Sequence, residues 1–348
     1  VGAAWQAKFH RLASLILLGV VGIVVCLTFA WFSAPDLALT QLAVEAVTTV
    51  LFLLGLRWMP KRVLQDDPRT AGRSSWRRYR DLLLSVLAGA GLAALSYALL
   101  TRTGAQSISP YYLEKALPEG GGTNVVNVML VDFRAFDTLG EITVLAIVGL
   151  TIFALLRRFR PPREVMETPP QQRAVAASGK PTDLVAPAEL HSDADPAQGY
   201  LLVPAVLVRL LLPVALVFAL HLFMRGHNQP GGGFVAGLTV AIAFIAQYMV
   251  GGTRWVEDRL NLDPPAWIAF GLGAALLTGL GALVFGYPFL TTHTAHASLP
   301  LLGEVHLPSA FFFDLGVFGV VVGSTLLLLT ALGHQSLRAR RRPAEEGS

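Results

Sequence analysis

The chain has 348 residues, of which 53% are hydrophobic and only 14% are charged, and its formal net charge is +4. A soluble domain of this length needs more polar surface, so an ordinary soluble protein is excluded. The basic residues stand in short runs beside apolar windows, which is typical of membrane topology and not of nucleic-acid binding. A single cysteine, Cys26, excludes an internal disulfide and a cysteine-ligated metal or redox cluster.

Long apolar windows predict membrane-spanning helices. About 20 residues, at about 1.5 Å of rise each, cross the roughly 30 Å hydrocarbon layer of a bilayer. Backbone groups inside lipid must find partners within the protein, so such windows are helical. We expect eight helices, at residues 12–33, 36–57, 81–101, 138–157, 200–224, 232–252, 265–286 and 308–333. The predicted fold is an all-α polytopic membrane protein.

Lysine and arginine residues predict the orientation of these spans. If both termini are cytoplasmic, most of the basic residues fall on the inner side, as the positive-inside rule requires. The first apolar run lacks a small-residue cleavage site and is interpreted as a span, not as a signal peptide. Since the chain starts with Val1 and not with Met, we expect it to begin partway through a longer polypeptide.

Residues 159–199 contain seven prolines mixed with Ala, Gln, Ser and acidic residues. Such a segment buries too little apolar surface to offset its ordering entropy. It predicts a disordered cytoplasmic linker, with a folded cytoplasmic domain as the alternative. The linker divides the chain into a four-helix module at residues 1–158 and a second one at 200–335, followed by a basic cytoplasmic tail at 336–348. Fusion of two ancestral subunits accounts for this organisation.

Two of the outside loops carry further patterns. Residues 124–132 alternate loosely between apolar residues and Asn or Asp, which predicts an amphipathic segment on the membrane surface or on a neighbouring protein of a complex. The last loop contains His293, His296, Glu304 and His306. Its threonines and prolines predict an irregular loop, and the chain has no HExxH motif. Neither a metal site nor a protease is therefore expected.

Glu45 is the ionisable residue that lipid is most expected to exclude. It follows Asp36 by nine residues, which places it near the bilayer centre at about 13.5 Å of rise. A carboxylate there costs about 2.5–3.5 kcal/mol or more, so it normally faces a protein interior or a water-filled path. Gln41 and either Thr48 or Thr49 share its helical face. We interpret this stripe as a proton or Na+ pathway; a structural hydrogen bond to a neighbouring helix is the alternative.

Further ionisable residues lie in or beside the spans. Asp137 and Glu141 are four residues apart on one helical face, so the two carboxylates either share a cation or proton at an ion entry or form an interfacial pair that reaches water. Arg209 and Asp314 enter their spans from opposite sides and are expected to form a structural ion pair, with a transport role second. Asp36 either caps the second span or stands at the mouth of the path.

A glycine-rich hairpin connects the fifth and sixth spans on the outside. Its motif residues are His227, Asn228, Pro230, Gly231, Gly232 and Gly233. Pro230 suits the start of the next helix, where its missing N–H costs little, and the glycines allow close helix approach and unusual φ and ψ. No Lys-Ser/Thr pair follows, so a phosphate-binding loop is not expected. We expect a structural hairpin whose His227 and Asn228 hydrogen-bond to another protein of a complex.

Three stretches resemble a known family. Residues 34–57 (APDLALTQLAVEAVTTVLFLLGLR) and 124–141 (NVVNVMLVDFRAFDTLGE) resemble the C-terminal region of the A-type subunits of the Mrp (Mnh) multisubunit Na+/H+ antiporters. Subunits of membrane-bound hydrogenases share that region. Residues 226–234 (GHNQPGGGF) resemble the signature hairpin of the B-type subunits. The modules that carry these stretches cover nearly the whole chain outside the linker.

The resemblance implies a fusion of A-type and B-type regions in the plasma membrane of a bacterial cell, with the other large and small antiporter subunits as partners. It implies secondary exchange of cytoplasmic Na+ for external H+, driven by the proton motive force, without an enzyme activity or a cofactor. In the family, acidic residues at the positions of Glu45, Asp137 and Glu141 are thought to line an ion path, to which Asp36 is a further candidate. The ion-pumping arm of a hydrogenase-like redox complex and a passive scaffold are the alternatives.

Overall fold

The structure is a computed structural model that describes residues 11–56, 71–102, 107–158, 202–251, 256, 263–299 and 303–345. Among these residues, eight helices are long and apolar enough to cross a membrane, which confirms the predicted fold. They are α2 (Arg11–Trp31), α3 (Pro35–Leu56), α4 (Ala71–Leu100), α7 (Ala135–Arg158), α10 (Leu202–Arg225), α11 (Gly233–Gly251), α13 (Pro264–Val284) and α14 (Ala310–Glu345).

Local sequence explains where several of these helices begin and end. α3 and α13 both begin at a proline, Pro35 and Pro264, at positions where a missing N–H is no loss. Asp36 in the first turn of α3 is favourable beside the positive end of the helix dipole. α14 continues past the predicted end at residue 333 to Glu345, because the residues after the span are mostly good helix formers.

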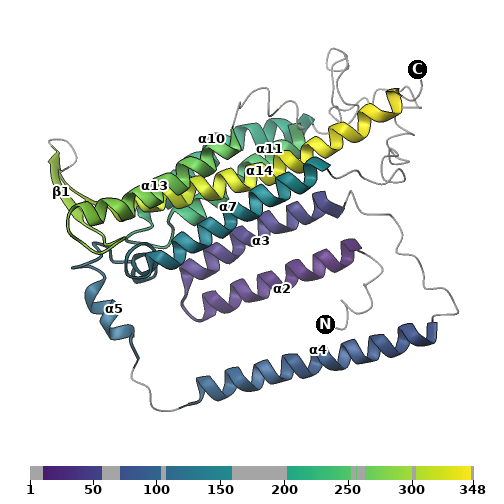
Figure 1. Cartoon of the computed structure of the whole chain (residues 1–348), viewed down its shortest axis with the longest axis horizontal. Helices are drawn as coiled ribbons and strands as arrows, with labels where there is room; N and C mark the ends of the chain where they lie inside the picture. Colours follow the sequence, from purple (N-terminus) through teal and green to yellow (C-terminus); the bar gives the residue numbers. More distant parts are fainter. Residues whose placement is uncertain are drawn as a thin grey trace. The chain divides into compact units, whose positions relative to one another are not determined.

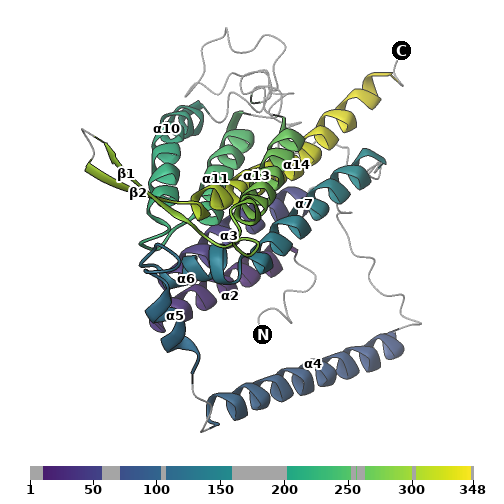
Figure 2. The same cartoon turned by 60° about the vertical axis from the view of Figure 1, so that its left-hand side comes forward.

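The chain forms two compact units, Val1–Met59 with Tyr112–Ser348, and Pro60–Tyr111. In the larger unit the long helices lie side by side (Figures 1 and 2). α14 is the most buried span and packs against α13, α11 and α7, while α11 also contacts α10 and α3, and α2 packs on α3. The helices on both sides of the proline-rich segment share one core, which includes Val47, Ile142, Leu238, Ile268 and Val320.

The two predicted modules therefore pack against each other. Residues 159–201 lie outside the described part of the chain, so the linker and the boundaries at 158 and 200 stay predictions.

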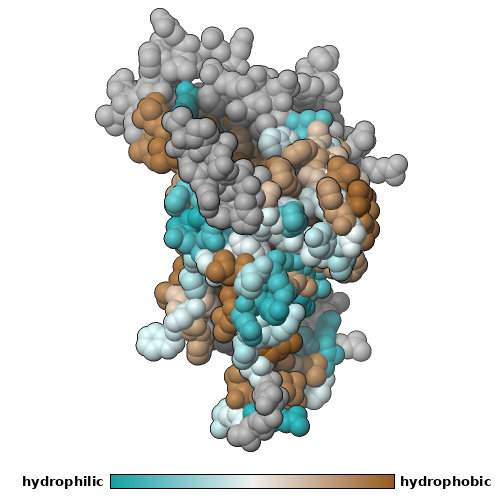
Figure 3. Space-filling view, turned by 90° about the vertical axis from the view of Figure 1, so that its left-hand side faces the viewer, coloured by the Kyte–Doolittle hydropathy of each residue, from teal (hydrophilic) through white to brown (hydrophobic). Residues whose placement is uncertain are grey.

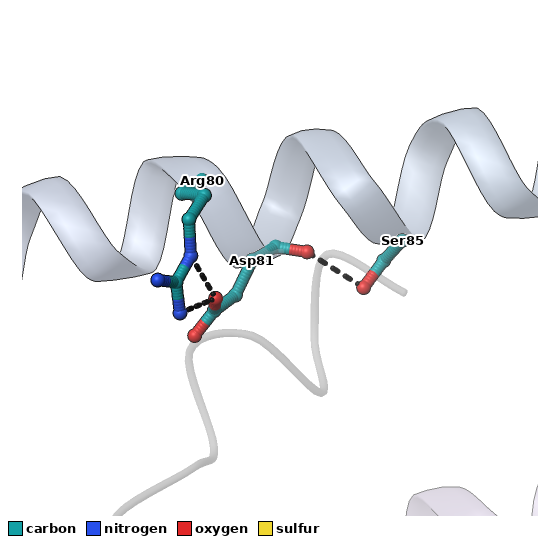
Figure 4. Close-up of polar contacts among 3 residues, drawn as sticks. All are labelled: Arg80, Asp81 and Ser85. Carbon is teal, nitrogen blue, oxygen red and sulfur yellow. Dashed lines mark hydrogen bonds and ion pairs between the residues drawn. The ribbon is translucent and has the colours of Figure 1, made fainter.

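The smaller unit contains α4, whose side chains are exposed where the structure describes them. Near the start of its apolar stretch, Arg80 Nη2 and Asp81 Oδ1 form an ion pair at 2.7 Å, and Ser85 Oγ donates a hydrogen bond to the Asp81 carbonyl at 2.8 Å (Figure 4). A solvent-exposed pair of this kind contributes little to stability. It lets two charged side chains partly neutralise each other at the point where the apolar stretch begins.

Short elements gather at one end of the larger unit. They are α6 (Val125–Val128), the π-helical segment η3 (Met129–Phe133), β1 (Thr294–Leu299) and β2 (Gly303–Pro308), and α5 (Ser109–Lys115) precedes them in the chain. Figure 3 views the end that carries β1 and shows hydrophilic side chains gathered there beside hydrophobic patches.

One of the two loop predictions is wrong, and the other is tested only in part. The segment predicted to be amphipathic, on the membrane surface or on a neighbouring protein, is helical. Val128 and Val131 in it are buried within this chain, whereas Val126 and Leu130 are exposed, so what they contact stays a prediction. The last loop is not irregular, because β1 and β2 pair as an antiparallel hairpin with His296 opposite His306. Within the described residues, no group of three or more His, Cys, Asp or Glu is placed to hold a metal ion.

Close contact between α13 and α14 depends on glycine. A Cβ at Gly271 would lie 2.6 Å from the Gly316 carbonyl oxygen and 2.6 Å from the Val320 amide nitrogen, both of them backbone atoms. A Cβ at Gly316 would likewise lie 2.6 Å from the Gly271 carbonyl oxygen. Small residues that let helix backbones approach are a common basis of helix association in membranes.

We expect Gly271→Ala to destabilise the protein by about 1–3 kcal/mol, since backbone atoms of α14 cannot yield without separating the helices. Gly273→Ala is the matched control, because a Cβ there meets nothing within 4 Å. Thermal unfolding of the purified complex in detergent measures both variants. Equal midpoints for the two variants would contradict the proposed close contact.

Candidate ion pathway and hairpin junction

Glu45 lies half-buried on α3, on the side that faces α2. Its Oε1 accepts a hydrogen bond from Thr49 Oγ1 at 3.3 Å, and Gly22 of α2 stands beside its Oε2. The sequence left open whether Thr48 or Thr49 shares the face of Glu45, and it is Thr49, one turn further along α3, that contacts the carboxylate. The carboxylate lies in the interface between two spans.

The other residues of the predicted stripe have different contacts. Thr48 Oγ1 donates to the Val44 carbonyl at 2.8 Å and lies 3.3 Å from the Glu45 carbonyl, so its hydroxyl bonds to the backbone of its own helix. Gln41 is half-buried one turn before Glu45. No described hydrogen bond joins either side chain to the carboxylate, and their part in an ion path stays a prediction.

Asp137 and Glu141 lie on an exposed face of α7. The opposite face carries Ile142 and Ala146, which are buried in the bundle. Asp137 forms an ion pair with Arg134, three residues earlier, so a basic side chain already compensates its charge. Glu141 is exposed one turn inside the span. No described contact joins these two carboxylates to the one on α3.

Asp36, at the start of α3, is part of a junction between three segments. Its Oδ1 accepts hydrogen bonds from Asn124 Nδ2 and from the Gly231 amide, each at 3.2 Å. The same Asn124 amide lies 3.0 Å from the carbonyl oxygens of Gly226 and Gln229. One asparagine therefore connects the start of α3, the start of α6 and the glycine-rich hairpin.

The glycine-rich hairpin does not start its helix at Pro230, as expected, but at Gly233. Gly232 has a φ of +100°, a conformation that side-chain-bearing residues rarely adopt and that is incompatible with a helix. Its N–H donates to the Leu222 carbonyl at 3.0 Å, and a Cβ on it would lie 2.8 Å from Asn127 Nδ2. The hairpin backbone thus lies close against α10 and α6 before the next helix can begin.

His227 and Asn228 bond within this chain, whereas the sequence predicted bonds to another protein of a complex. His227 Nε2 lies 2.8 Å from the Gly120 carbonyl, which can only accept, so Nε2 carries the proton. Thr123 donates to Asn228 twice, from its N–H to Oδ1 at 3.2 Å and from Oγ1 to the carbonyl at 3.0 Å. Burial lowers the pKa of His227, and the bond to Gly120 partly opposes this shift.

Asp314 has a different partner from the predicted Arg209. Its Oδ2 accepts a hydrogen bond at 2.7 Å from the amide of Gly233, the first residue of α11, where a carboxylate is favoured by the helix dipole. Arg209 lies 16 residues before Arg225 at the hairpin end of α10, which is about 24 Å of rise. The expected ion pair is replaced by a helix-end contact, because the two residues stand toward opposite ends of their spans.

Sequence reasoning noted the Asn and Asp residues of segment 124–132 but missed that Asn124, Asn127 and Asp132 make contacts inside this chain. The two asparagines are only 8% and 7% exposed. Asp132 Oδ1 accepts a hydrogen bond from the Thr292 amide at 3.2 Å; burial raises the pKa of this carboxyl, and the bonds from Thr292 oppose the rise. Asn124, Val128 and Asp132 recur every four residues, a helical spacing that could have indicated a buried face.

Eight apolar spans, with a carboxylate between two of them, define an integral membrane protein with an ionisable group inside the membrane. Comparison with protein families gives three matches along the chain. Residues 1–61 match the MBH family MbhD and residues 76–173 match the MBH family MbhE. Residues 203–327 match a "domain related to MnhB subunit of Na+/H+ antiporter".

Individual relatives agree with these matches. The chain is 54% identical over 99% of its length to a probable fused A/B protein of a K+/H+ antiporter from Rhizobium meliloti, and it spans 34% of that relative. It is 37% identical, over 38% of its own length, to the B-type protein of a Na+/H+ antiporter from Alkalihalophilus pseudofirmus, of which it covers 91%.

A solved Mrp complex from Dietzia sp. contains a chain with a TM-score of 0.77 and 30% identity, covering 95% of this chain and 33% of that one. The chain therefore belongs to the Mrp antiporter family, and it joins a region like the C-terminal part of the A-type proteins to a region like the B-type proteins. It spans about a third of the length of its A/B relative.

We expect Asn124→Asp to undock the hairpin, because a carboxylate would face Asp36 and two carbonyl oxygens with no N–H to donate. Each buried group left without a partner costs about 1–3 kcal/mol. Asn228→Ala is the control, since Asn228 is exposed and should cost about 1 kcal/mol or less. Hydrogen exchange of residues 226–233 in the complex measures both variants. Equal protection of the hairpin in Asn124→Asp and Asn228→Ala would contradict the role of Asn124 in docking it.

We expect docking of the hairpin to weaken in mild acid. Because the folded pKa of His227 is below its ordinary 6.5, the undocked imidazole binds a proton more readily. Docking is therefore strongest above pH 6.5 and is lost progressively as the pH falls through that value. Hydrogen exchange of the hairpin, corrected for the intrinsic effect of pH, checks this. His227→Gln should remove the dependence; an unchanged pH profile in that variant would refute it.

Proposed function

We propose that this chain forms part of a multisubunit antiporter that exchanges cytoplasmic Na+ for external H+, driven by the proton motive force. The observation that carries the proposal is Glu45, a carboxylate held half-buried between α2 and α3 inside a span. The names of the relatives, which are K+/H+ and Na+/H+ antiporter components, support it. Such exchange needs no ATP and no cofactor, since Na+ and H+ are the transported ions. The chain is then one component of a secondary transporter and not an enzyme.

Glu45 acts in this proposal as the site that holds a proton or a cation in turn. In surroundings of low dielectric, an uncompensated carboxylate is unfavourable, so it binds one of the two. Thr49 donates to Oε1 and steadies the side chain, which leaves Oε2 toward α2. Gln41 and Thr48 extend the polar face of α3, and Asp36 stands at the outer mouth of this path.

The carboxylates on α7 extend the proposed path toward other subunits. An exposed carboxylate inside a span costs about 2.5–3.5 kcal/mol or more against lipid. The exposure of Glu141 therefore supports contact with a protein or water surface at this face of α7. Asp137, already paired with Arg134, would guide ions toward it. The partners proposed here are the large antiporter-like subunits and the small subunits of the complex.

The proposed location is the plasma membrane of a bacterial cell, with both ends of the chain in the cytoplasm. Its support is the distribution of Lys and Arg along the sequence, which places most of them on one side of the spans. An even number of described spans agrees with both ends lying on the same side.

The ion-pumping membrane arm of a hydrogenase-like redox complex is the second candidate. The matches of residues 1–61 and 76–173 to MbhD and MbhE favour it. The MnhB-related region at 203–327, and its fusion to the other two, favour the antiporter instead. A passive scaffold between channel-bearing subunits is the remaining alternative, and the same experiment tests it.

We expect Glu45→Gln and Glu45→Ala to reduce exchange to near background while the complex assembles normally, because neither side chain can release a proton or bind a cation by charge. The measurement is cation-dependent H+ transport in everted vesicles of an antiporter-deficient host that expresses the complete complex. Na+ and K+ are compared in parallel, which decides the cation.

Glu119→Gln is the matched control, since Glu119 is exposed, lies outside the spans and pairs with Lys115 at 2.5 Å. It should exchange ions like the wild type. Full activity of both Glu45 variants would refute the proposed role and favour the scaffold. Cation-dependent transport that requires a redox substrate would favour the hydrogenase-like arm.

A further inference from the structure

α2 passes Glu45 with two glycines one turn apart, Gly19 and Gly22. Gly22 is buried, and a Cβ on it would overlap Oε2 and Cδ of Glu45 and lie 3.0 Å from its Cγ. A Cβ on Gly19 would find its nearest neighbour, Glu45 Oε1, at 3.5 Å, which is an ordinary contact. A Cβ would therefore overlap the Glu45 carboxylate at position 22 but not at position 19.

The carboxylate of Glu45 occupies the space in which any other residue at position 22 would place its Cβ. On the opposite side, Thr49 Oγ1 donates to Oε1 at 3.3 Å. The side chain is therefore held between a notch in α2 and a hydroxyl of its own helix.

The distance between the two helices is itself constrained near this notch. Cys26, one turn beyond Gly22, donates from Sγ to the Ala38 carbonyl at 3.2 Å. The turn between α2 and α3 is short and closed by a backbone bond from the Ala34 amide to the Phe29 carbonyl at 2.9 Å. α2 cannot move away from α3 here without breaking these contacts, so an added Cβ must displace the Glu45 side chain.

We propose that Gly22 is a positioning residue: the absence of a side chain there fixes where the Glu45 carboxylate stands and hence how readily it takes up a cation or a proton. This inference rests on the proposed function. It differs from a packing role, because the atoms that a Cβ would overlap belong to the end of a flexible side chain and not to a backbone. Alanine in a helix interior is itself more favourable than glycine, so the substitution does not weaken α2 as a helix.

The test uses the complete complex in everted vesicles, with Gly22→Ala, Gly19→Ala, Glu45→Asp and the double variant Gly22→Ala/Glu45→Asp. We expect Gly22→Ala to raise the cation concentration for half-maximal exchange severalfold and to shift the pH profile, at unchanged complex levels. Gly19→Ala should match the wild type. The double variant should recover toward Glu45→Asp alone, because aspartate is one methylene shorter and no longer reaches the notch.

A second readout does not depend on transport. Carbodiimide labelling of the acidic residue at position 45, followed by mass spectrometry of its peptide, reports how accessible that carboxyl group is and how readily it is protonated. Its rate should change in Gly22→Ala and stay at the wild-type value in Gly19→Ala. If Glu45→Gln keeps full exchange, the proposed function fails, while a changed labelling rate still supports the positioning by Gly22.

Wild-type values of half-saturation, pH profile and labelling in Gly22→Ala would overturn the inference. If Gly22→Ala fails to assemble, the double variant decides between the two roles. Recovered assembly on shortening the acidic side chain shows that the carboxylate occupies the notch. Continued failure assigns Gly22 to helix packing and overturns the positioning role.

Discussion

The side-chain amide of Asn124 joins segments that are about 90 to 105 residues apart in the sequence. Its two hydrogens serve Asp36 at the start of α3 and the carbonyls of Gly226 and Gln229 in the hairpin, while its own oxygen accepts from the Asn127 amide at 3.3 Å. Backbone groups in such a turn have no helical partners, so a buried side chain that satisfies them is a strong constraint. This junction fixes the first turn of α3, the helix that carries Glu45.

The hairpin end also explains how regions matched to separate proteins form one unit. α3 packs on α11, and α7 packs on α14, across the proline-rich segment. Asp36 from one region and Asp314 from the other both accept hydrogen bonds from the same glycine-rich stretch, at Gly231 and Gly233. Backbone amides at the start of a helix are good partners for carboxylates. Two acidic residues therefore hold helices in register through the backbone amides of the hairpin.

The acidic residues inside spans fall into two settings. Glu45 lies half-buried between two helices of its own chain, with the Thr49 hydroxyl and Gly22 beside it. Residues of this chain therefore determine where its carboxylate lies. Glu141 is exposed on α7 and requires a surface from elsewhere to be tolerated in a membrane. The position of Glu45 is set by contacts within this chain, whereas the surroundings of Glu141 depend on the surface that packs against α7. An ion path built from both must cross from this chain to another surface.

Local patterns in the sequence predict the spans and the depth of Glu45, because transfer into lipid depends on the local run of apolar residues and on rise along a helix. They also indicate the hairpin and the family through residues 226–234. The partners of individual side chains depend on the packed fold. Thr49 and not Thr48 contacts Glu45, Asp314 accepts from the first amide of α11 and does not meet Arg209, and α11 begins at Gly233. Hydrogen-bond partners far apart in the chain leave no local pattern, and a positive φ at Gly232 follows from close packing that only the assembled helices impose.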